Sequence, residues 1–168
     1  MSMRVLAFDP GFERLGAAVV EKVKGTDILL YSACLRSDAV LPFPERLASL
    51  GREVEKLLKK WKPEAVALED LYFAKNVKTA MQVAEVRGML IYLAAAKGLP
   101  VHHYTPLQVK IAVTGYGQSD KHAVAAMVPH LVALPAAKVG VKKRLDDEMD
   151  AIAVGLTCLA SLRIYPQS

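Results

Sequence analysis

Arg4-Val5-Leu6-Ala7-Phe8-Asp9-Pro10-Gly11 is an apolar run that ends on an acid and is stopped by a Pro-Gly pair. A short apolar run bounded by turn residues is typical of a buried strand. A second such run, Ala65-Val66-Ala67-Leu68-Glu69, also ends on an acid. If these strands are parallel neighbours, Asp9 and Glu69 lie at one sheet edge, where ligands bind in open α/β sheets.

The rest of the chain predicts further strands and helices around these two runs. Two strands over 15–23 and 28–36 would follow the first in an antiparallel meander, joined by a turn over 24–27, and a fifth strand is expected over 99–104. Apolar residues three and four apart between Pro44 and Pro63 predict a helix. Further helices are expected over 77–97 (capped by Asn76), 106–113, from Ser119 or Asp120 to about Pro129, and 146–162, with a flexible loop over 114–119 and another loop over 135–145.

This element order predicts an α/β fold with a five-stranded mixed sheet and helices on both faces. The length of 168 residues suits one domain spanning 1–168, and the hydrophobic share of 53% indicates a globular chain. The net charge of +5 favours a polyanionic partner. No apolar run is long enough for a membrane span, and no signal peptide is recognised. Cys34 and Cys158 lie in apolar runs without metal-site spacing, so we expect buried free thiols and a cytoplasmic location.

A third group of acids opens the last predicted helix. Asp147 and Asp150 are three residues apart, which places them on one helix face. Acids in a first helical turn are also favoured by the helix dipole, an alternative that covers Asp146, Asp147 and Glu148. Asp150 lies among apolar neighbours, and a buried carboxylate needs a partner or a metal ion.

Four carboxylates, from Asp9, Glu69, Asp147 and Asp150, therefore form a candidate metal site. Oxygen ligands favour Mg²⁺ or Mn²⁺, and a pair of such ions supports phosphoryl transfer. Asp9 by itself is also compatible with an ordinary turn or with the phosphate-binding start of actin-like folds and sugar kinases. A second glycine-rich phosphate loop, which those folds need, is not found in this sequence.

Basic and aromatic residues accompany the acids. Lysines near a phosphodiester bind backbone phosphates and stabilise developing charge. Aromatics beside a carboxylate site can stack on unpaired bases, or they can plug the core beneath a loop. The candidate DNA contacts are Tyr72, Phe73, Lys75, Lys110, Lys121, Lys142, Lys143 and Arg144.

The order and spacing of these motifs resemble the RuvC family of Holliday junction resolvases, from about Met3 to Leu162. The likeness rests on Phe8-Asp9-Pro10-Gly11, Ala67-Leu68-Glu69-Asp70, Arg87-Gly88, Pro106-Leu107-Gln108-Val109-Lys110, Gly115-Tyr116-Gly117, Lys121 and Asp150-Ala151-Ile152-Ala153. The resemblance implies an RNase H-like fold and a homodimer formed through the helix over 77–97. It also implies Mg²⁺-dependent symmetric nicking of four-way DNA junctions, leaving 5′-phosphate and 3′-hydroxyl ends.

The resemblance also implies roles for individual residues. Asp9, Glu69, Asp147 and Asp150 match the family's four acidic positions, which would hold two Mg²⁺ ions or Mn²⁺ in their place. Asp146 and Glu148 remain alternatives to Asp147. Lys110 and Lys121 match lysines near the active site, and Tyr72 matches an aromatic residue that opens base pairs. A branch-migration helicase is an open partner, and another RNase H-like nuclease or a non-catalytic junction-binding module are the alternative functions.

Overall fold

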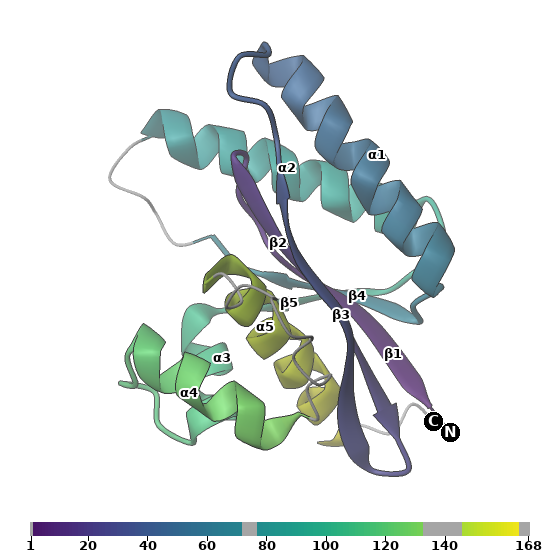
Figure 1. Ribbon diagram of the computed structural model, residues 1–168. Coiled ribbons are helices and arrows are strands. Elements are labelled where there is room, and N and C mark those ends of the chain that lie inside the picture. Colours follow the sequence, from purple (N-terminus) through teal and green to yellow (C-terminus); the bar gives the residue numbers. More distant parts are fainter. Residues whose placement is uncertain (1, 72–76, 133–145, 165–168) are drawn as a thin grey trace, which may run out of the picture.

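The structure, a computed structural model, describes residues 2–71, 77–132 and 146–164 (Figure 1). Within these ranges the chain forms five strands and five helices. In chain order they are β1 (Met3–Asp9), β2 (Arg14–Val23), β3 (Thr26–Arg36), α1 (Phe43–Trp61), β4 (Ala65–Glu69), α2 (Val77–Ala95), β5 (Val101–Tyr104), α3 (Pro106–Thr114), α4 (Lys121–Leu131) and α5 (Asp146–Ile164). No helix among the described residues is long and apolar enough to cross a bilayer.

The strands form one mixed sheet in the order β3-β2-β1-β4-β5. β1, β2 and β3 are antiparallel, whereas β1 pairs with β4, and β4 with β5, in parallel. Phe8 of β1 is opposite Leu68 of β4, so Asp9 and Glu69 follow at the same edge of the sheet. The predicted five-stranded sheet and the parallel pairing of the two acid-terminated strands are confirmed.

Local sequence explains most element boundaries. Lys24 and Gly25 both have positive φ (49° and 87°), which makes the two-residue hairpin turn that suits the twist of antiparallel strands. Thr105 caps α3 in a capping box with Gln108. Of the two candidate caps for α4, Asp120 is the one used, since its side chain accepts from the Ala123 N–H at 2.8 Å.

As expected, α4 ends near Pro129, two residues beyond it. The helix continues to Leu131, and the N–H of Val132 donates to the Val128 carbonyl at 3.2 Å. The proline therefore lies in the last turn, where the loss of one backbone donor is tolerated. Asn76 and the predicted loop over 135–145 lie outside the described residues.

The sheet has helices on both faces, as predicted. α1 and α2 cover one face, and α5, accompanied by α3 and α4, covers the other (Figure 1). Residues of β1 alternate between the two cores: Val5 and Ala7 pack with α5, while Leu6 and Phe8 pack with α1 and α2. Gly155 of α5 lies over the sheet, where a Cβ atom would come within 2.7 Å of the Val20 side chain and 3.2 Å of Ala7. α5 therefore packs closely against the strands that carry the acids.

Both cysteines are free thiols, as expected. Cys158, on α5, is buried in the core. Cys34 is only partly buried, so the expectation that it lies in the core is wrong: it is on edge strand β3 and faces the start of α5.

Candidate active site

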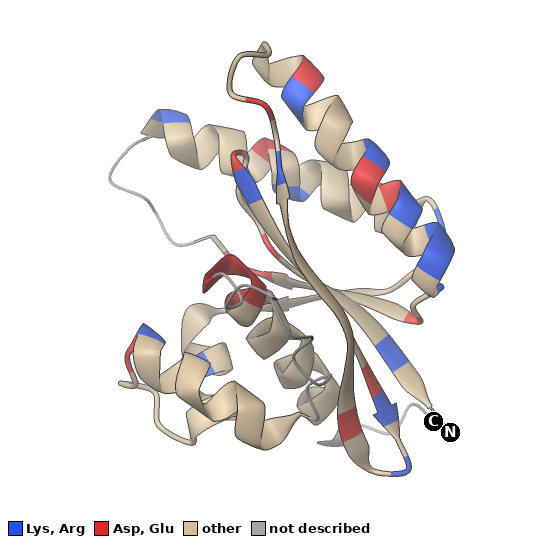
Figure 2. Ribbon diagram, in the orientation of Figure 1, with Lys and Arg blue, Asp and Glu red and all other residues tan. Residues whose placement is uncertain are grey.

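The four predicted carboxylates converge where β1 and β4 meet the first turns of α5. Strand alternation directs Asp9 and Glu69 to the α5 face, because they continue the series Val5, Ala7 and Ala65, Ala67 that packs against this helix. The first turn of α5 is acidic and lies beside the sheet (Figure 2). The negative charges of the carboxylates act on one another and raise the pKa values of Asp9 and Glu69.

The pKa is raised at three of these carboxyl groups, with the large shifts at Asp9 and Glu69. Burial, followed by the charges of Asp150, Glu69 and Asp147, raises the pKa of Asp9 to about 8. Burial and the charge of Asp150 raise the pKa of Glu69 to about 7. The cluster is therefore short of positive charge, and a bound cation would stabilise the ionised form of both groups.

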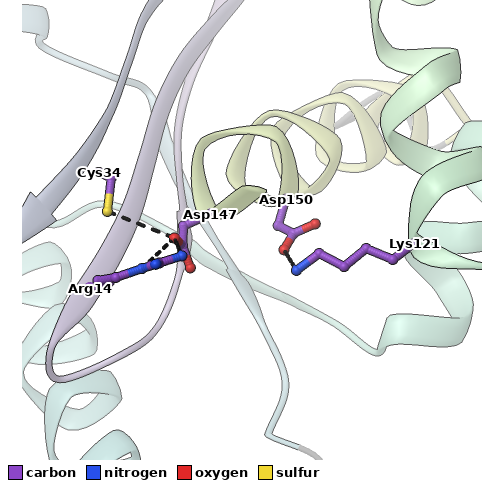
Figure 3. A network of polar contacts seen from close by, with 5 residues as sticks. All are labelled: Arg14, Cys34, Lys121, Asp147 and Asp150. Atoms are coloured by element: carbon purple, nitrogen blue, oxygen red, sulfur yellow. Dashed lines mark hydrogen bonds and ion pairs between the residues drawn. The ribbon is translucent and has the colours of Figure 1, made fainter. Parts of the chain in front are cut away.

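Lys121, the first residue of α4, supplies part of that charge. Its Nζ atom lies 2.7 Å from Oδ2 of Asp150 (Figure 3). The hydrogen bond to Asp150 raises the pKa of Lys121, while burial raises the pKa of Asp150 against the opposing effect of the lysine. Lys121 thus lies at the carboxylate cluster, and its role in the reaction stays a prediction.

Arg14, at the start of β2, was not singled out from the sequence. Its Nε donates to Oδ2 of Asp147 at 2.8 Å, and Nη2 donates to the same oxygen. The Cys34 thiol is 3.8 Å from that oxygen. Figure 3 shows Asp147 directed toward Arg14 and Asp150 directed toward Lys121, although both acids belong to α5. The contact joins residues 133 positions apart, so no local pattern predicts it.

Gly16 of β2 was also missed, and it controls how closely α5 approaches. Gly16 is opposite Asp9 in the sheet, and a Cβ atom there would lie 2.0 Å from the backbone carbonyl oxygen of Asp147. The same atom would be 3.2 Å from Cβ of Asp9. Only glycine at this position allows the helix carrying Asp147 and Asp150 to contact the strand beside Asp9.

A cleft of about 290 Å³ opens beside the cluster. It contains two of the four acids and both candidate lysines. Its lining residues are Glu69, Pro106, Val109, Lys110, Lys121, Val124, Asp150 and Ala153. Lys110, on α3, therefore lines the same cavity as Lys121. Phosphate binding by the two lysines stays a prediction.

Neighbouring acids differ in what they contact. The Ser32 hydroxyl donates to Glu148 at 2.8 Å, which directs this side chain to β3. Asp70, next to Glu69, accepts from Nη2 of Arg87 at 2.8 Å, and His103 Nδ1 is 3.0 Å from the same Arg87 nitrogen. This network connects α2 and β5 to the residue after Glu69, and it gives His103, which was expected to be an ordinary polar residue, a structural contact.

The donor set fits a hard divalent cation in its chemistry. All four candidate ligands are carboxylates, and the raised pKa values of Asp9 and Glu69 mark a site that lacks positive charge. Among the described residues, no three Asp, Glu, His or Cys side chains form a ready-made metal-binding group. Two of the carboxylates are instead engaged by Arg14 and Lys121, so metal coordination by all four remains a prediction.

Six of the candidate DNA contacts lie outside the described residues. They are Tyr72, Phe73, Lys75, Lys142, Lys143 and Arg144. Of the residues expected to contact DNA, the structure thus places Lys110 and Lys121 at the carboxylate cleft.

The chain is similar to known proteins in both sequence and fold. The family model described as "Crossover junction endodeoxyribonuclease RuvC" matches residues 5–158. The chain belongs to the RuvC family. Members from Desulfitobacterium hafniense and Thermomicrobium roseum are 40% and 42% identical to it over 154 residues, which is 92% of this chain and 90% and 91% of theirs.

Solved structures of RuvC agree with the fold. The structure of "T. thermophilus RuvC in complex with Holliday junction substrate" matches with a TM-score of 0.85 and 33% identity over 96% of both chains. The yeast mitochondrial Holliday junction resolvase Ydc2 matches with a TM-score of 0.71 at 13% identity, over 97% of this chain and 81% of the other, and so shares the fold. The predicted RNase H-like architecture and RuvC resemblance are confirmed.

Proposed function

We propose that this protein is a structure-selective endonuclease that resolves four-way DNA junctions by hydrolysing phosphodiester bonds. One observation carries the proposal: acids from β1, β4 and α5 gather beside two lysines in a chain that the RuvC family model matches over residues 5–158. The phosphate backbone of DNA is the polyanion that the net charge of +5 favours.

Asp9, Glu69, Asp147 and Asp150 would hold two Mg²⁺ ions, with Mn²⁺ as a substitute. Bound ions of this type supply a more acidic water and charge stabilisation at the scissile phosphate. Lys110 and Lys121 would bind the phosphate backbone at the cleft and offset the charge that develops during hydrolysis. Cleavage would leave 5′-phosphate and 3′-hydroxyl ends.

Symmetric nicking requires two sites, and the outer face of α2 supports a homodimer. Val77, Met81 and Tyr92 are exposed on it by 72%, 61% and 70%. Ala84 and Gly88 lie on the same exposed face, and nothing lies within 4 Å of the position of a Cβ on Gly88. Small residues beside exposed apolar ones allow two helices to approach closely and to bury apolar area.

The candidate contacts outside the described residues belong to the same proposal. Tyr72 and Phe73 would stack on bases opened at the junction centre, and Lys75, Lys142, Lys143 and Arg144 would bind phosphates. We further propose a cytoplasmic enzyme, which is consistent with the free thiols of Cys34 and Cys158. A branch-migration helicase would be a partner in delivering junctions.

The direct test is cleavage of a labelled mobile four-way junction in Mg²⁺, beside linear duplex and RNA–DNA hybrid of matched sequence. Paired symmetric nicks in the junction alone are expected, with none in EDTA. Junction binding without cleavage in either Mg²⁺ or Mn²⁺ would favour a non-catalytic binding module. Preferred cleavage of the hybrid would favour another RNase H-like nuclease. Sedimentation of the same sample measures whether the active species is a dimer.

A further inference from the structure

The connection between α3 and α4 determines where Lys121 lies. Lys110 is on α3, and Lys121 is the first residue of α4, directly after the capping residue Asp120. Lys121 reaches Asp150 at 2.7 Å across the cleft. Any displacement of this short connection therefore moves the ammonium group relative to the carboxylates.

The hydroxyl group of Thr114 forms hydrogen bonds that hold this connection in place. Oγ1 of Thr114 is 2.7 Å from the Lys110 carbonyl oxygen, 3.1 Å from the Tyr116 N–H nitrogen and 2.7 Å from Oγ of Ser119. A hydroxyl has one proton to donate and two lone pairs. It donates to Lys110 and accepts from Tyr116 and Ser119, which uses its full capacity. The Tyr116 carbonyl, 3.0 Å from Oγ1, accepts from the Ser119 N–H at 3.1 Å.

The loop is also pressed against α3 from its other side. A Cβ atom on Gly117 would lie 2.7 Å from Cδ1 of Leu107 and 3.4 Å from Cγ1 of Ile111. Gly115 takes a left-handed conformation (φ 75°) as the C-cap of α3, and its N–H donates to the Ile111 carbonyl. The segment predicted as a flexible loop is thus tied at its first residue, its middle and its last residue.

We propose that Thr114 is a positioning residue for Lys121: its hydroxyl fixes the α3–α4 loop so that Lys121 meets the Asp150 carboxylate at the cleft. The inference rests on the proposed function, because Lys121 has a role only if the cleft binds the scissile phosphate. Thr114 does not itself line the cleft, but its hydroxyl bonds the backbone carbonyl of Lys110, a cleft-lining residue of the same helix. The proposal is that its effect on cleavage passes through Lys121 and not through Lys110.

The test compares Thr114→Val with Thr114→Ser in single-turnover junction cleavage. Valine keeps the shape and removes the hydroxyl, whereas serine keeps the hydroxyl. We expect Thr114→Val to slow cleavage about tenfold through misplacement of a reacting-site group, and Thr114→Ser to retain most of the rate. Junction affinity should fall less than the rate, because Lys121 is one of several proposed phosphate contacts. In a Lys121→Ala background, Thr114→Val should add less than about twofold, since coupled residues are not additive. Ser119→Ala, which removes one of the three bonds, serves as a milder second variant.

Amide hydrogen exchange supplies a readout that does not depend on cleavage. The Tyr116 and Ser119 amides should lose protection in Thr114→Val and keep it in Thr114→Ser. Unchanged protection in Thr114→Val overturns the inference whatever the enzyme cleaves. So does a normal cleavage rate in Thr114→Val when Lys121→Ala is slow, a result that leaves the proposed function intact. Equal additional slowing in the Lys121→Ala background also overturns it. If wild-type protein cleaves no junction, the proposed function fails, and the inference fails with it.

Discussion

The two faces of the sheet are packed with side chains of different size. On the α1 and α2 face, β1 and β4 contribute Leu6, Phe8, Val66 and Leu68. On the α5 face the same strands contribute Val5, Ala7, Ala65 and Ala67, and a Cβ atom at Gly16 or Gly155 would overlap the facing element. Large side chains fill the space between the sheet and helices α1 and α2. Smaller side chains on the other face allow α5 to pack close to the strands.

This difference explains where the acids can meet. Asp9 and Glu69 end the series of small residues, so they face the helix that lies nearest to the sheet. This arrangement is electrostatically unfavourable for the ionised acids, because burial and neighbouring charges raise the pKa of both groups. The acids therefore come together on the α5 face, whereas the opposite face buries apolar side chains.

The largest effect is expected for Asp9→Asn on the α5 face. Loss of a ligand carboxylate should reduce junction cleavage roughly 1,000-fold or more, since ligand loss removes several kcal/mol of transition-state stabilisation. Junction binding should persist because the lysines are unchanged. Cleavage rates and gel-shift affinities in Mg²⁺ measure both. A variant that cleaves at the wild-type rate would show that Asp9 is not a ligand.

Gly16→Ala tests the close approach directly. The new methyl group would overlap the Asp147 carbonyl, so α5 must shift and cleavage should fall about 100-fold. Gly51→Ala, on the α1 face, is the matched control, because its methyl meets only the flexible Met89 side chain at 3.1 Å. It should cleave normally and melt close to the wild-type temperature. Similar cleavage rates for the two variants would mean that the reaction tolerates a larger distance between α5 and β2.

The raised pKa values predict how the metal-free protein responds to pH. Asp9 titrates near 8 in the folded protein and near its ordinary value of 3.8 when unfolded. Asp9 holds its proton more tightly in the folded than in the unfolded protein, so protonation stabilises the fold. This contribution is fully present below pH 4 and is lost as the pH rises through 8. Glu69 acts in the same direction up to about pH 7.

The melting temperature in EDTA should therefore fall by roughly 5 °C between pH 5.5 and 8.5. Asp9→Asn should reduce this fall and melt higher than wild type at pH 8.5. Mg²⁺ should restore stability to the wild-type protein alone. A flat pH profile in EDTA would contradict the charge imbalance assigned to the α5 face.

The smallest effect is expected for Arg14→Ala. If Asp147 is a metal ligand, as proposed, Arg14 competes with the metal ion for it. The Arg14 side chain is 44% exposed, so the ion pair is partly screened by solvent. The Mg²⁺ concentration for half-maximal cleavage should fall roughly twofold to fivefold. Mn²⁺ binding followed by electron paramagnetic resonance gives the same comparison without cleavage.

Arg36→Ala is the control for loss of charge alone, since Arg36 is opposite Arg14 across the β2–β3 pair. If Arg14→Ala needs more Mg²⁺ than wild type, Arg14 supports the metal site and does not compete with it.

Local patterns along the chain are enough to predict which residues become strands and helices and which acids end them. The two-residue period of β1 and β4 carries Asp9 and Glu69 to one face, and the three-residue spacing places Asp147 and Asp150 together on α5. These signals are local, so they can be read from neighbours along the chain. The end of α4 near Pro129 is a further local signal of this kind.

The contacts that each acid makes, in contrast, depend on how distant elements pack together. The pairing of Arg14 with Asp147 spans 133 residues, and the fit of Gly16 under Asp147 depends on the distance between a helix and a strand. The contact of Arg87 with Asp70 likewise depends on how α2 lies beside β5. Such contacts follow from register and packing distance, which no local pattern in one sequence encodes.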